Sequence, residues 1–321
     1  MTRFPRFIAA AVQAAPVYLN REATVDKACR LIREAGASGA RLAAFGEVFV
    51  PGFPYWNYLD IPHKTRSWHL RLYEHSVDVP GPEVDRLCEA ARGAHVNVVI
   101  GVNERSPISP GGIYNTNLII SSEGVLLGRH RKLVPTWAEK LTHTPGDGSG
   151  LKVYRTDVGP LGTLACGENT NTLARFALLA QGELVHVANY PSTPYPEEYD
   201  LVEGIKLRAG AHSFEGKVFT VAVSMPITPE IVEMLCDSDE KRRMLSRRPC
   251  AFSGIFGPDG RLMGDGLVDA EGIVYGEIDL QRCIAAKLRH DLIGHYNRFD
   301  VFDLRVNRRP IEPATFFDGE H

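Results

Sequence analysis

The chain has 321 residues, of which 44% are hydrophobic and 23% are charged, and its formal net charge at pH 7 is −3. This composition is typical of a soluble globular protein with a large core, and the near-balanced charge argues against a surface that binds polyanions. The one basic cluster, at 241–248, follows three acidic residues and is expected on a solvated helix face. We therefore expect no nucleic acid partner.

The six cysteines are scattered, with no C-x-x-C pair and no Cys/His spacing suited to zinc. The sequence thus predicts neither a disulfide framework nor a metal site. The apolar stretch at 7–12 is too short for a signal peptide, and no apolar run approaches the length of a membrane span. We expect a protein of the reducing cytoplasm that does not contact a membrane.

Short apolar runs alternate with amphipathic stretches through the first half of the chain. Residues 21–35 repeat apolar side chains with the helical period behind Asn20, a capping residue, and 65–75 and 82–93 are predicted to be helical as well. The turn residues 122–124 predict a hairpin. The predicted strands of this half are 7–12, 41–47, 96–102, 113–121 and 124–128.

The second half continues the alternation of strands and helices. Strands are predicted at 153–157, 161–165, 184–189 and 218–224, with strand pairs around 253–263 and 272–278, and helices at 172–181, 197–215 and 229–248. Residues 135–150 are predicted to be a loop. Such alternation indicates an α/β fold, and the hairpins argue against a purely parallel sheet. One domain is expected, because no linker or internal repeat divides the chain.

Three side chains of complementary chemistry lie at or just beyond the ends of predicted strands: Glu47, Lys132 and Cys166. Strand ends gather at one edge of a layered α/β fold, where sites form. A carboxylate beside a thiol can act as general base, and an ammonium group can lower the pKa of the thiol and stabilise negative charge on a substrate. The trio therefore indicates nucleophilic catalysis by Cys166.

Each member of this trio also has a plain structural interpretation. Glu47 could cap a turn, Lys132 could be a solvated lysine between basic neighbours, and Cys166 could be core packing, since cysteine is among the most buried residue types. Spacing along the chain cannot decide whether the three side chains meet.

Five segments resemble, in matching order, the signature blocks of the nitrilase superfamily, and specifically of its nitrilase branch. The glutamate, lysine and cysteine blocks and two further branch motifs are resembled by 45–56, 130–136, 162–169, 208–216 and 291–302. The resemblance implies a four-layer α-β-β-α sandwich, with a carbon-nitrogen hydrolase domain at 1–285 and a C-terminal extension at 286–321 that takes part in oligomer contacts. It implies a homodimer or larger homo-oligomer and no cofactor or metal.

The resemblance also implies roles for residues around the trio. Glu139 is similar to the second carboxylate of the branch, and Gly167, Glu168, Asn169 and His212 are expected to support the site. Tyr55, Trp56, Trp137 and Tyr190 adjoin the catalytic blocks and are candidates for a substrate wall, with aromatic core as the alternative. The chain departs from the branch at two positions. Gly167 stands where tryptophan is common, and Phe299 where proline is usual.

The activity implied is hydrolysis of an organic nitrile to a carboxylic acid and ammonia through a thioimidate and a thioester on Cys166. The alternative within the superfamily is an amidase or carbamoyl-hydrolase that uses the same trio. Alternatives of other classes are a non-catalytic interaction protein and a redox role for Cys166, although no resolving cysteine is near it in sequence. The expected partner is a small nitrile or amide, whose identity and product ratio stay open.

Overall fold

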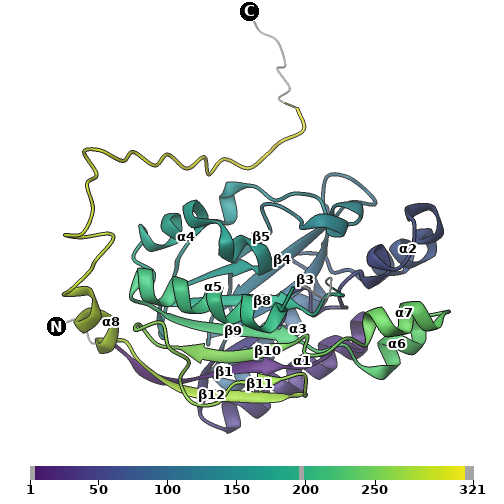
Figure 1. The fold of residues 1–321 in the computed structure, drawn as a ribbon, viewed down its shortest axis with the longest axis horizontal. Coiled ribbons are helices and arrows are strands. Elements are labelled where there is room, and N and C mark those ends of the chain that lie inside the picture. The colour runs from purple at the N-terminus through teal and green to yellow at the C-terminus, as the bar shows by residue number, and fades with distance from the viewer. Residues whose placement is uncertain (1–3, 195–198, 315–321) are drawn as a thin grey trace, which may run out of the picture.

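Two six-stranded sheets form the centre of the molecule (Figure 1), which a computed structural model describes for residues 4–194 and 199–314. The first sheet contains β1 (Arg6–Gln13), β2 (Ala40–Phe45), β3 (Asn97–Arg105), β4 (Ile113–Ile120), β5 (Leu126–Arg131) and β12 (Gly272–Asp279). Its strand order is β12-β1-β2-β3-β4-β5. Strands β1, β2 and β3 are parallel, and the other pairs are antiparallel.

The second sheet repeats this plan. It contains β6 (Tyr154–Thr156), β7 (Gly159–Ala165), β8 (Val185–Pro191), β9 (Phe219–Met225), β10 (Phe252–Phe256) and β11 (Leu267–Val268). Its order is β11-β10-β9-β8-β7-β6, with β7, β8 and β9 parallel. Parallel strands at the centre of each sheet place the carboxyl ends of β2, β7 and β8 where polar side chains can gather.

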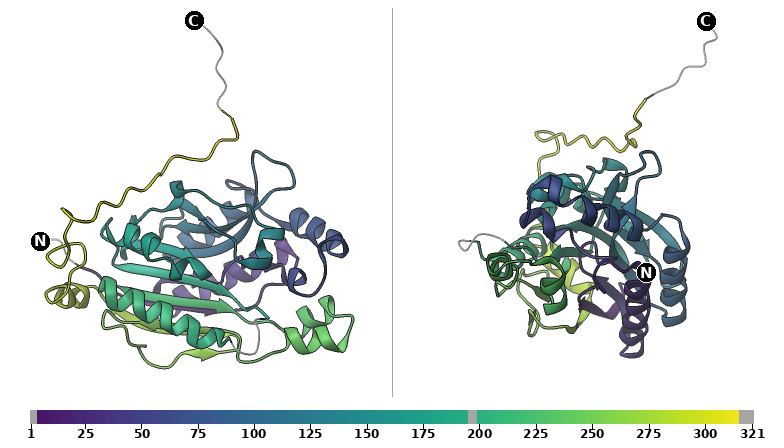
Figure 2. Two further views of the ribbon diagram at one scale, coloured as in Figure 1. Left: turned by 45° about the horizontal axis from the view of Figure 1, so that its top comes forward. Right: turned by 90° about the vertical axis from the view of Figure 1, so that its right-hand side faces the viewer.

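Helices cover the outer face of each sheet (Figure 2). The first sheet carries α1 (Arg21–Ala37) and α3 (Pro82–Ala94), and the second carries α4 (Thr172–Leu179) and α5 (Leu201–Gly216). Helix α1 begins where expected, because the Asn20 side chain accepts the Ala23 N–H at 3.1 Å. The four-layer α-β-β-α sandwich is therefore confirmed.

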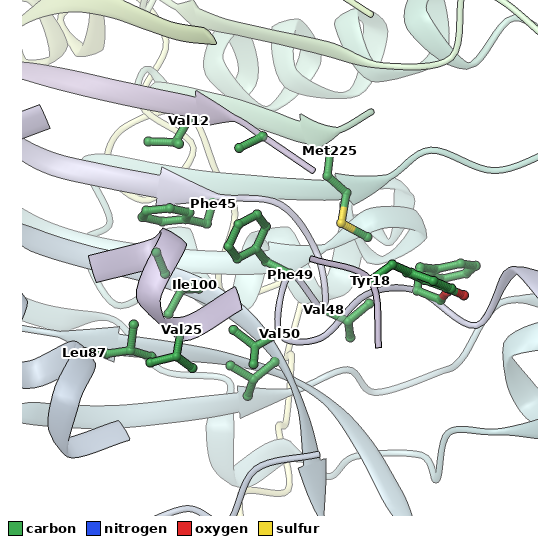
Figure 3. Packing of buried hydrophobic residues seen from close by; sticks show 14 of the residues in the cluster. Val12, Tyr18, Val25, Phe45, Val48, Phe49, Val50, Leu87, Ile100 and Met225 are labelled. Carbon is green, nitrogen blue, oxygen red and sulfur yellow. The ribbon is translucent and has the colours of Figure 1, made fainter. Parts of the chain in front are cut away.

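Successive side chains of a central strand point to opposite faces of its sheet, so they pack in different layers of the core. In β1, Ala9 and Ala11 pack between the sheets while Ala10 and Val12 pack against the helices. Both faces of this strand are buried, as is typical of parallel strands under helices. At the strand ends, the rings of Phe45 and Phe49 lie 5.4 Å apart, and Met225 of the second sheet reaches toward them (Figure 3).

Several predicted elements differ from the structure. The helix predicted at 229–248 is two helices, α6 (Pro229–Leu235) and α7 (Asp239–Leu245), because Ser238 caps a new helix by accepting the Lys241 N–H. The helix predicted at 197–215 begins at Leu201 behind its cap Asp200, and 197–198 lie outside the described residues. The loop predicted at 135–150 contains two 3-10 helices, Trp137–Leu141 and Gly148–Gly150.

The remaining elements lie at the ends of the sandwich. Helix α2 (Arg66–His75) and two 3-10 helices, Tyr55–Tyr58 and Pro62–Lys64, lie near α6 and α7 in Figure 1. Helix α8 (Gln281–Lys287) spans the domain boundary expected at 285/286 and leads into an extended tail. None of the helices in the described ranges is long and apolar enough to cross a membrane.

Candidate active site

Glu47 lies two residues beyond β2, in a turn that rests on the neighbouring strand. A Cβ atom on Gly101 of β3 would lie 2.3 Å from the backbone N of Val48, so only glycine allows this close approach. The Glu47 N–H points toward the carbonyl oxygen of Tyr190, at 3.4 Å, at the end of β8 in the other sheet. Glu47 is therefore fully buried where the two sheets meet.

Lys132 follows the last residue of β5, and its backbone N–H donates to the Asn115 carbonyl of β4 at 2.8 Å. Its ammonium group lies between two carboxylates, 2.7 Å from Glu47 Oε1 and 2.6 Å from Glu139 Oε2, and its side chain is inaccessible to solvent. Burial lowers the pKa of Lys132, but the two carboxylates outweigh burial and raise this pKa well above its usual value. Lys132 is a fixed positive charge.

Glu139 reaches the site from the 3-10 helix at Trp137–Leu141. Its Oε2 accepts the Thr136 N–H at 2.8 Å, which closes a capping box with the Thr136 side chain. The side-chain amide of Asn115 bridges the two carboxylates, donating to Glu47 Oε1 at 2.6 Å and to Glu139 Oε1 at 3.1 Å. Lysine and asparagine together hold the two carboxylates side by side.

The two carboxyl groups differ in pKa. Burial raises the pKa of Glu47 to about 7, and the charge of Glu139 adds to this effect against the opposing effect of Lys132. Burial also raises the pKa of Glu139, but the contacts with Lys132 and His143 outweigh burial and lower this pKa below its usual range. Glu139 also accepts the Thr136 N–H, which favours its ionised form, so a proton that the pair takes up binds to Glu47. A carboxyl group with a pKa near 7 is suited to general base catalysis at neutral pH.

Cys166 follows β7 directly and starts a 3-10 helix, Cys166–Thr170. Its φ of 47° is in the left-handed region, which is uncommon for a residue other than glycine. Burial raises the pKa of its thiol to about 12, with a further increase from the charge of Glu47, while Lys132 acts in the opposite direction. The thiol therefore rests protonated and needs a base to become a nucleophile.

Glu47 is available to act as that base. Its Oε2 is buried and has no hydrogen-bond partner among the described residues, whereas its Oε1 is held by Lys132 and Asn115. The charges of Glu47, Lys132 and Glu139 all act on the Cys166 thiol. The structure thus brings the predicted trio and the second carboxylate together.

Glu168 and Asn169 hold the turn that carries Cys166. Glu168 accepts the Ala165 N–H at 2.9 Å and the Leu133 N–H at 2.7 Å, which ties the end of β7 to the segment that carries Lys132. Its other partner is His130, whose Nε2 lies 2.9 Å from Glu168 Oε2. The Asn169 amide donates to the carbonyl oxygens of Leu164 and Cys166, both at 3.1 Å.

The predicted aromatic residues differ in exposure. Tyr55, Trp56 and Tyr190 are fully buried, and their hydroxyl or indole N–H groups have no partner within the described ranges. Tyr190 packs in the same buried cluster as Cys166, so its ring lies near the nucleophile. Trp137, by contrast, is 65% exposed. Three of the four aromatics are thus interior, and one is at the surface.

Gly167 and His212 lie in different surroundings. A Cβ atom on Gly167 would lie 3.2 Å from the Thr136 hydroxyl, which is a tight contact, and would meet no other atom of the described residues within 4 Å. His212 lies on α5, outside the trio, and its Nε2 is 2.9 Å from Glu183 Oε2. It joins a buried group that reaches Asn169 through His186.

Sequence reasoning missed Asn115, Glu183 and His186. Asn115 lies within the buried strand β4, and His186 within the buried strand β8. A polar residue inside a run with both faces buried is a signal that could have identified Asn115 and His186, since such a group needs an internal partner. Glu183 is in the turn before β8 and offered no comparable signal.

The chain is similar to known proteins over nearly its whole length. Residues 8–288 match the model of the carbon-nitrogen hydrolase family. An aliphatic nitrilase of Rhodococcus rhodochrous is 39% identical, over 96% of this chain and 85% of its own. A nitrilase of Pseudomonas syringae is 37% identical, over 94% and 90%. The chain belongs to the carbon-nitrogen hydrolase family, and these relatives confirm the nitrilase branch expected from its motifs.

Solved structures share the fold. A carbon-nitrogen hydrolase from Helicobacter pylori superposes with a TM-score of 0.69 at 19% identity, covering 91% of this chain and 97% of its own. An amidase from Nesterenkonia superposes with a TM-score of 0.63 at 16% identity, covering 89% and 96%. At these identities the likeness concerns the fold alone.

Proposed function

We propose that this protein hydrolyses an organic nitrile to a carboxylic acid and ammonia through a covalent intermediate on Cys166. The observation that carries the proposal is that the buried Lys132 ammonium lies between Glu47 and Glu139. The charges of these three groups act on the Cys166 thiol. The similarity to relatives named nitrilase over nearly the whole chain supports nitriles as the substrate class.

The first step joins the thiol to the nitrile. Glu47 accepts the proton of Cys166 through its unpartnered Oε2, and the thiolate attacks the nitrile carbon. Negative charge develops on the nitrile nitrogen, where Lys132 and the Gly167 N–H stabilise it. The proton held by Glu47 passes to that nitrogen, which leaves a neutral thioimidate.

Two water molecules complete the reaction. Glu47 takes a proton from the first water as it adds to the thioimidate carbon, and protonation of the nitrogen lets ammonia leave, which forms a thioester. The second water hydrolyses the thioester to the carboxylic acid and returns the proton to the Cys166 sulfur. If the thiol leaves the first tetrahedral adduct before ammonia does, the product is an amide.

The surrounding residues have supporting roles in this scheme. Glu139 tethers Lys132, because it lies 2.6 Å from the ammonium group and stays ionised. Glu168 and Asn169 hold the nucleophile turn through their backbone hydrogen bonds. We place Tyr55, Trp56 and Tyr190 in the substrate wall and Trp137 at its solvent edge. Gly167 places no side chain beside the nucleophile, where even a Cβ atom would press on the Thr136 hydroxyl, so we propose that its small size affects which substrates fit.

A panel of matched nitriles and amides tests the proposal. We expect ammonia and acid from nitriles, and an adduct on Cys166 by intact-mass analysis. Cys166→Ala should abolish both, whereas Cys29→Ala on α1, remote from the site, should abolish neither. Turnover of amides alone would indicate an amidase or carbamoyl-hydrolase instead. If no member of the panel is turned over or forms an adduct, the scaffold is not catalytic.

We further propose that residues 286–321 form an extension that contributes to contacts between copies of a homodimer or larger homo-oligomer. Its described part crosses the surface near α4 and leaves a groove of about 410 Å³ lined by apolar residues such as Phe176 and Phe302. Phe302 itself is 69% exposed. A chain ending at Leu288 should sediment as a smaller assembly than the full chain, and an unchanged assembly would argue against this role.

We also propose a cytoplasmic location, with which the six free cysteines are consistent.

A further inference from the structure

A buried polar chain runs from α5 to the nucleophile turn, outside the trio. His212 Nε2 lies 2.9 Å from Glu183 Oε2, and Glu183 Oε1 lies 2.7 Å from His186 Nδ1. His186 Nε2 lies 2.8 Å from Asn169 Oδ1, and the Asn169 amide nitrogen contacts the carbonyl oxygen of Cys166. All of these side chains are buried, so each contact replaces water with a protein partner.

The pattern of donors and acceptors determines the protonation of His186. Asn169 Nδ2 faces two carbonyl oxygens, of Leu164 and Cys166, so this end of the amide must be the NH₂ group. Asn169 Oδ1 then faces His186 Nε2 and can only accept a hydrogen bond. His186 therefore donates from Nε2 to Asn169 and from Nδ1 to the Glu183 carboxylate, so its ring carries both protons.

The charges of the neighbouring groups agree with this assignment. Burial raises the pKa of Glu183, but His186 and His212 outweigh it and lower this pKa to about 2, so Glu183 is ionised. Burial and the charge of His186 lower the pKa of His212 to about 4, so His212 is neutral and donates from Nε2. The group thus holds one ion pair, Glu183 with His186, away from solvent.

The same side chains could in principle hold a metal ion, because ligand atoms of Glu183, His186 and His212 all lie within 4.8 Å of one another. However, both nitrogens of His186 and both oxygens of Glu183 already take part in contacts of 2.7–2.9 Å, which are hydrogen-bond distances. The contacts among these residues favour hydrogen bonding over coordination.

Asn169 acts at a turn whose backbone has an uncommon conformation. Its NH₂ group holds the carbonyl oxygens before and within the turn, and Cys166 between them has a φ of 47°. A non-glycine residue persists in this conformation when the surrounding contacts determine it. If the His186 N–H that Asn169 Oδ1 accepts were lost, the Asn169 amide could rotate and release both carbonyl groups.

We infer that His186 and Glu183 are positioning residues for the Cys166 nucleophile: their ion pair orients Asn169, which holds the nucleophile turn. This inference rests on the proposed covalent function of Cys166. Two residues outside the trio, one on β8 and one in the turn before β8, therefore help to hold the nucleophile.

Kinetics of two His186 variants test the inference. His186→Ala removes the donor, and we expect kcat on the best nitrile to fall on the order of 10²-fold with little change in KM, because small displacements of a nucleophile cost this much. His186→Gln keeps an N–H donor in reach of Asn169 and should recover most of kcat. The matched control is Ser213→Ala, which removes the buried hydrogen bond of Ser213 to Thr220 without touching the turn. It should leave kcat unchanged.

A double variant separates positioning from packing. If His186 acts through Asn169, adding His186→Ala to Asn169→Ala should cause no further loss of kcat. Additive losses, or equal losses in His186→Ala and Ser213→Ala, would overturn the inference.

Two measurements need no substrate, so they distinguish failure of this inference from failure of the proposed function. The ¹⁵N NMR shifts of His186 at pH 7.5, assigned by comparison with His186→Gln, should be those of a doubly protonated ring. The rate of Cys166 alkylation by iodoacetamide should change in His186→Ala and not in Ser213→Ala. A neutral His186 ring, an unchanged alkylation rate, or one equivalent of metal lost on substitution of His186 would refute the inference.

Discussion

Replacement of Lys132 by methionine would remove the one ammonium group that separates two buried carboxylates. Glu47 and Glu139 lie 2.7 and 2.6 Å from its Nζ, and all three side chains are at most 2% exposed. Removing one partner from a buried ion pair typically costs about 3–5 kcal/mol of unfolding free energy, because it leaves a charge without compensation. The loss of a preorganised group that stabilises developing charge should also lower kcat by about 10²–10³-fold.

The pH dependence makes this prediction specific. In Lys132→Met both carboxyl groups lose their counter-charge, so the already raised pKa of Glu47 rises further and the lowered pKa of Glu139 rises as well. A carboxyl group with a raised pKa in the folded state lowers stability as pH increases beyond the unfolded value. The stability difference between parent and variant should therefore be smallest near pH 4.5 and largest at pH 8.

Urea unfolding across this pH range and ammonia release at saturating nitrile measure the two effects. Lys206→Met is a suitable control, because Lys206 lies 2.6 Å from Glu203 in a pair that is 35% and 57% exposed. An exposed pair of this kind contributes up to about 1 kcal/mol, so this variant should keep its stability and kcat. A stability difference for Lys132→Met that does not depend on pH would refute the reasoning.

Three further predictions concern the rest of the site. Because burial raises the pKa of Glu47 to about 7 and the ionised form accepts the thiol proton, kcat/KM should increase with pH through about 7; a flat profile from pH 5 to 8 would contradict this. Tyr190→Phe removes a buried hydroxyl that has no partner in the described ranges, so thermal unfolding should show no loss of stability, and a loss above about 1 kcal/mol would argue for an internal partner. Gly167→Trp adds a large ring beside the nucleophile, where a Cβ atom already lies 3.2 Å from the Thr136 hydroxyl, so kcat/KM should fall more for bulky aromatic nitriles than for small aliphatic ones; equal losses would exclude Gly167 as a determinant of size.

Much of the fold was predictable from local patterns. The apolar run at 7–12 and the Asn20 cap identify β1 and α1 because burial and capping act within a few residues. The pairing of β12 with β1 was not predictable, since Gly272–Asp279 has no local feature that selects a strand near the N-terminus. The break between α6 and α7 could have been predicted from Ser238 followed by acidic residues, a capping signal that the charged helical pattern obscured.

The site likewise contains residues that could be identified from the sequence and residues that could not. Glu47, Lys132 and Cys166 were identifiable because they follow strand ends and belong to motifs. The residues that hold them act over long separations in sequence: the Asn115 amide bonds Glu47 across 68 positions, and no motif marks it. The Glu183–His186 pair depends on where β8 packs, which only the tertiary structure specifies.

The pairing of β1 with β12 has a consequence for how the chain folds during synthesis. Arg6 lies opposite Asp279, so the outer edge of β1 has no partner strand until nearly the whole protein has been made. At about 5–20 residues per second, that interval is roughly 15–50 s. Throughout it, one edge of an apolar strand lacks its partner and can pair with another nascent chain. Ribosome-bound chains that stop before β12 should therefore need chaperone protection that the released, full-length protein does not.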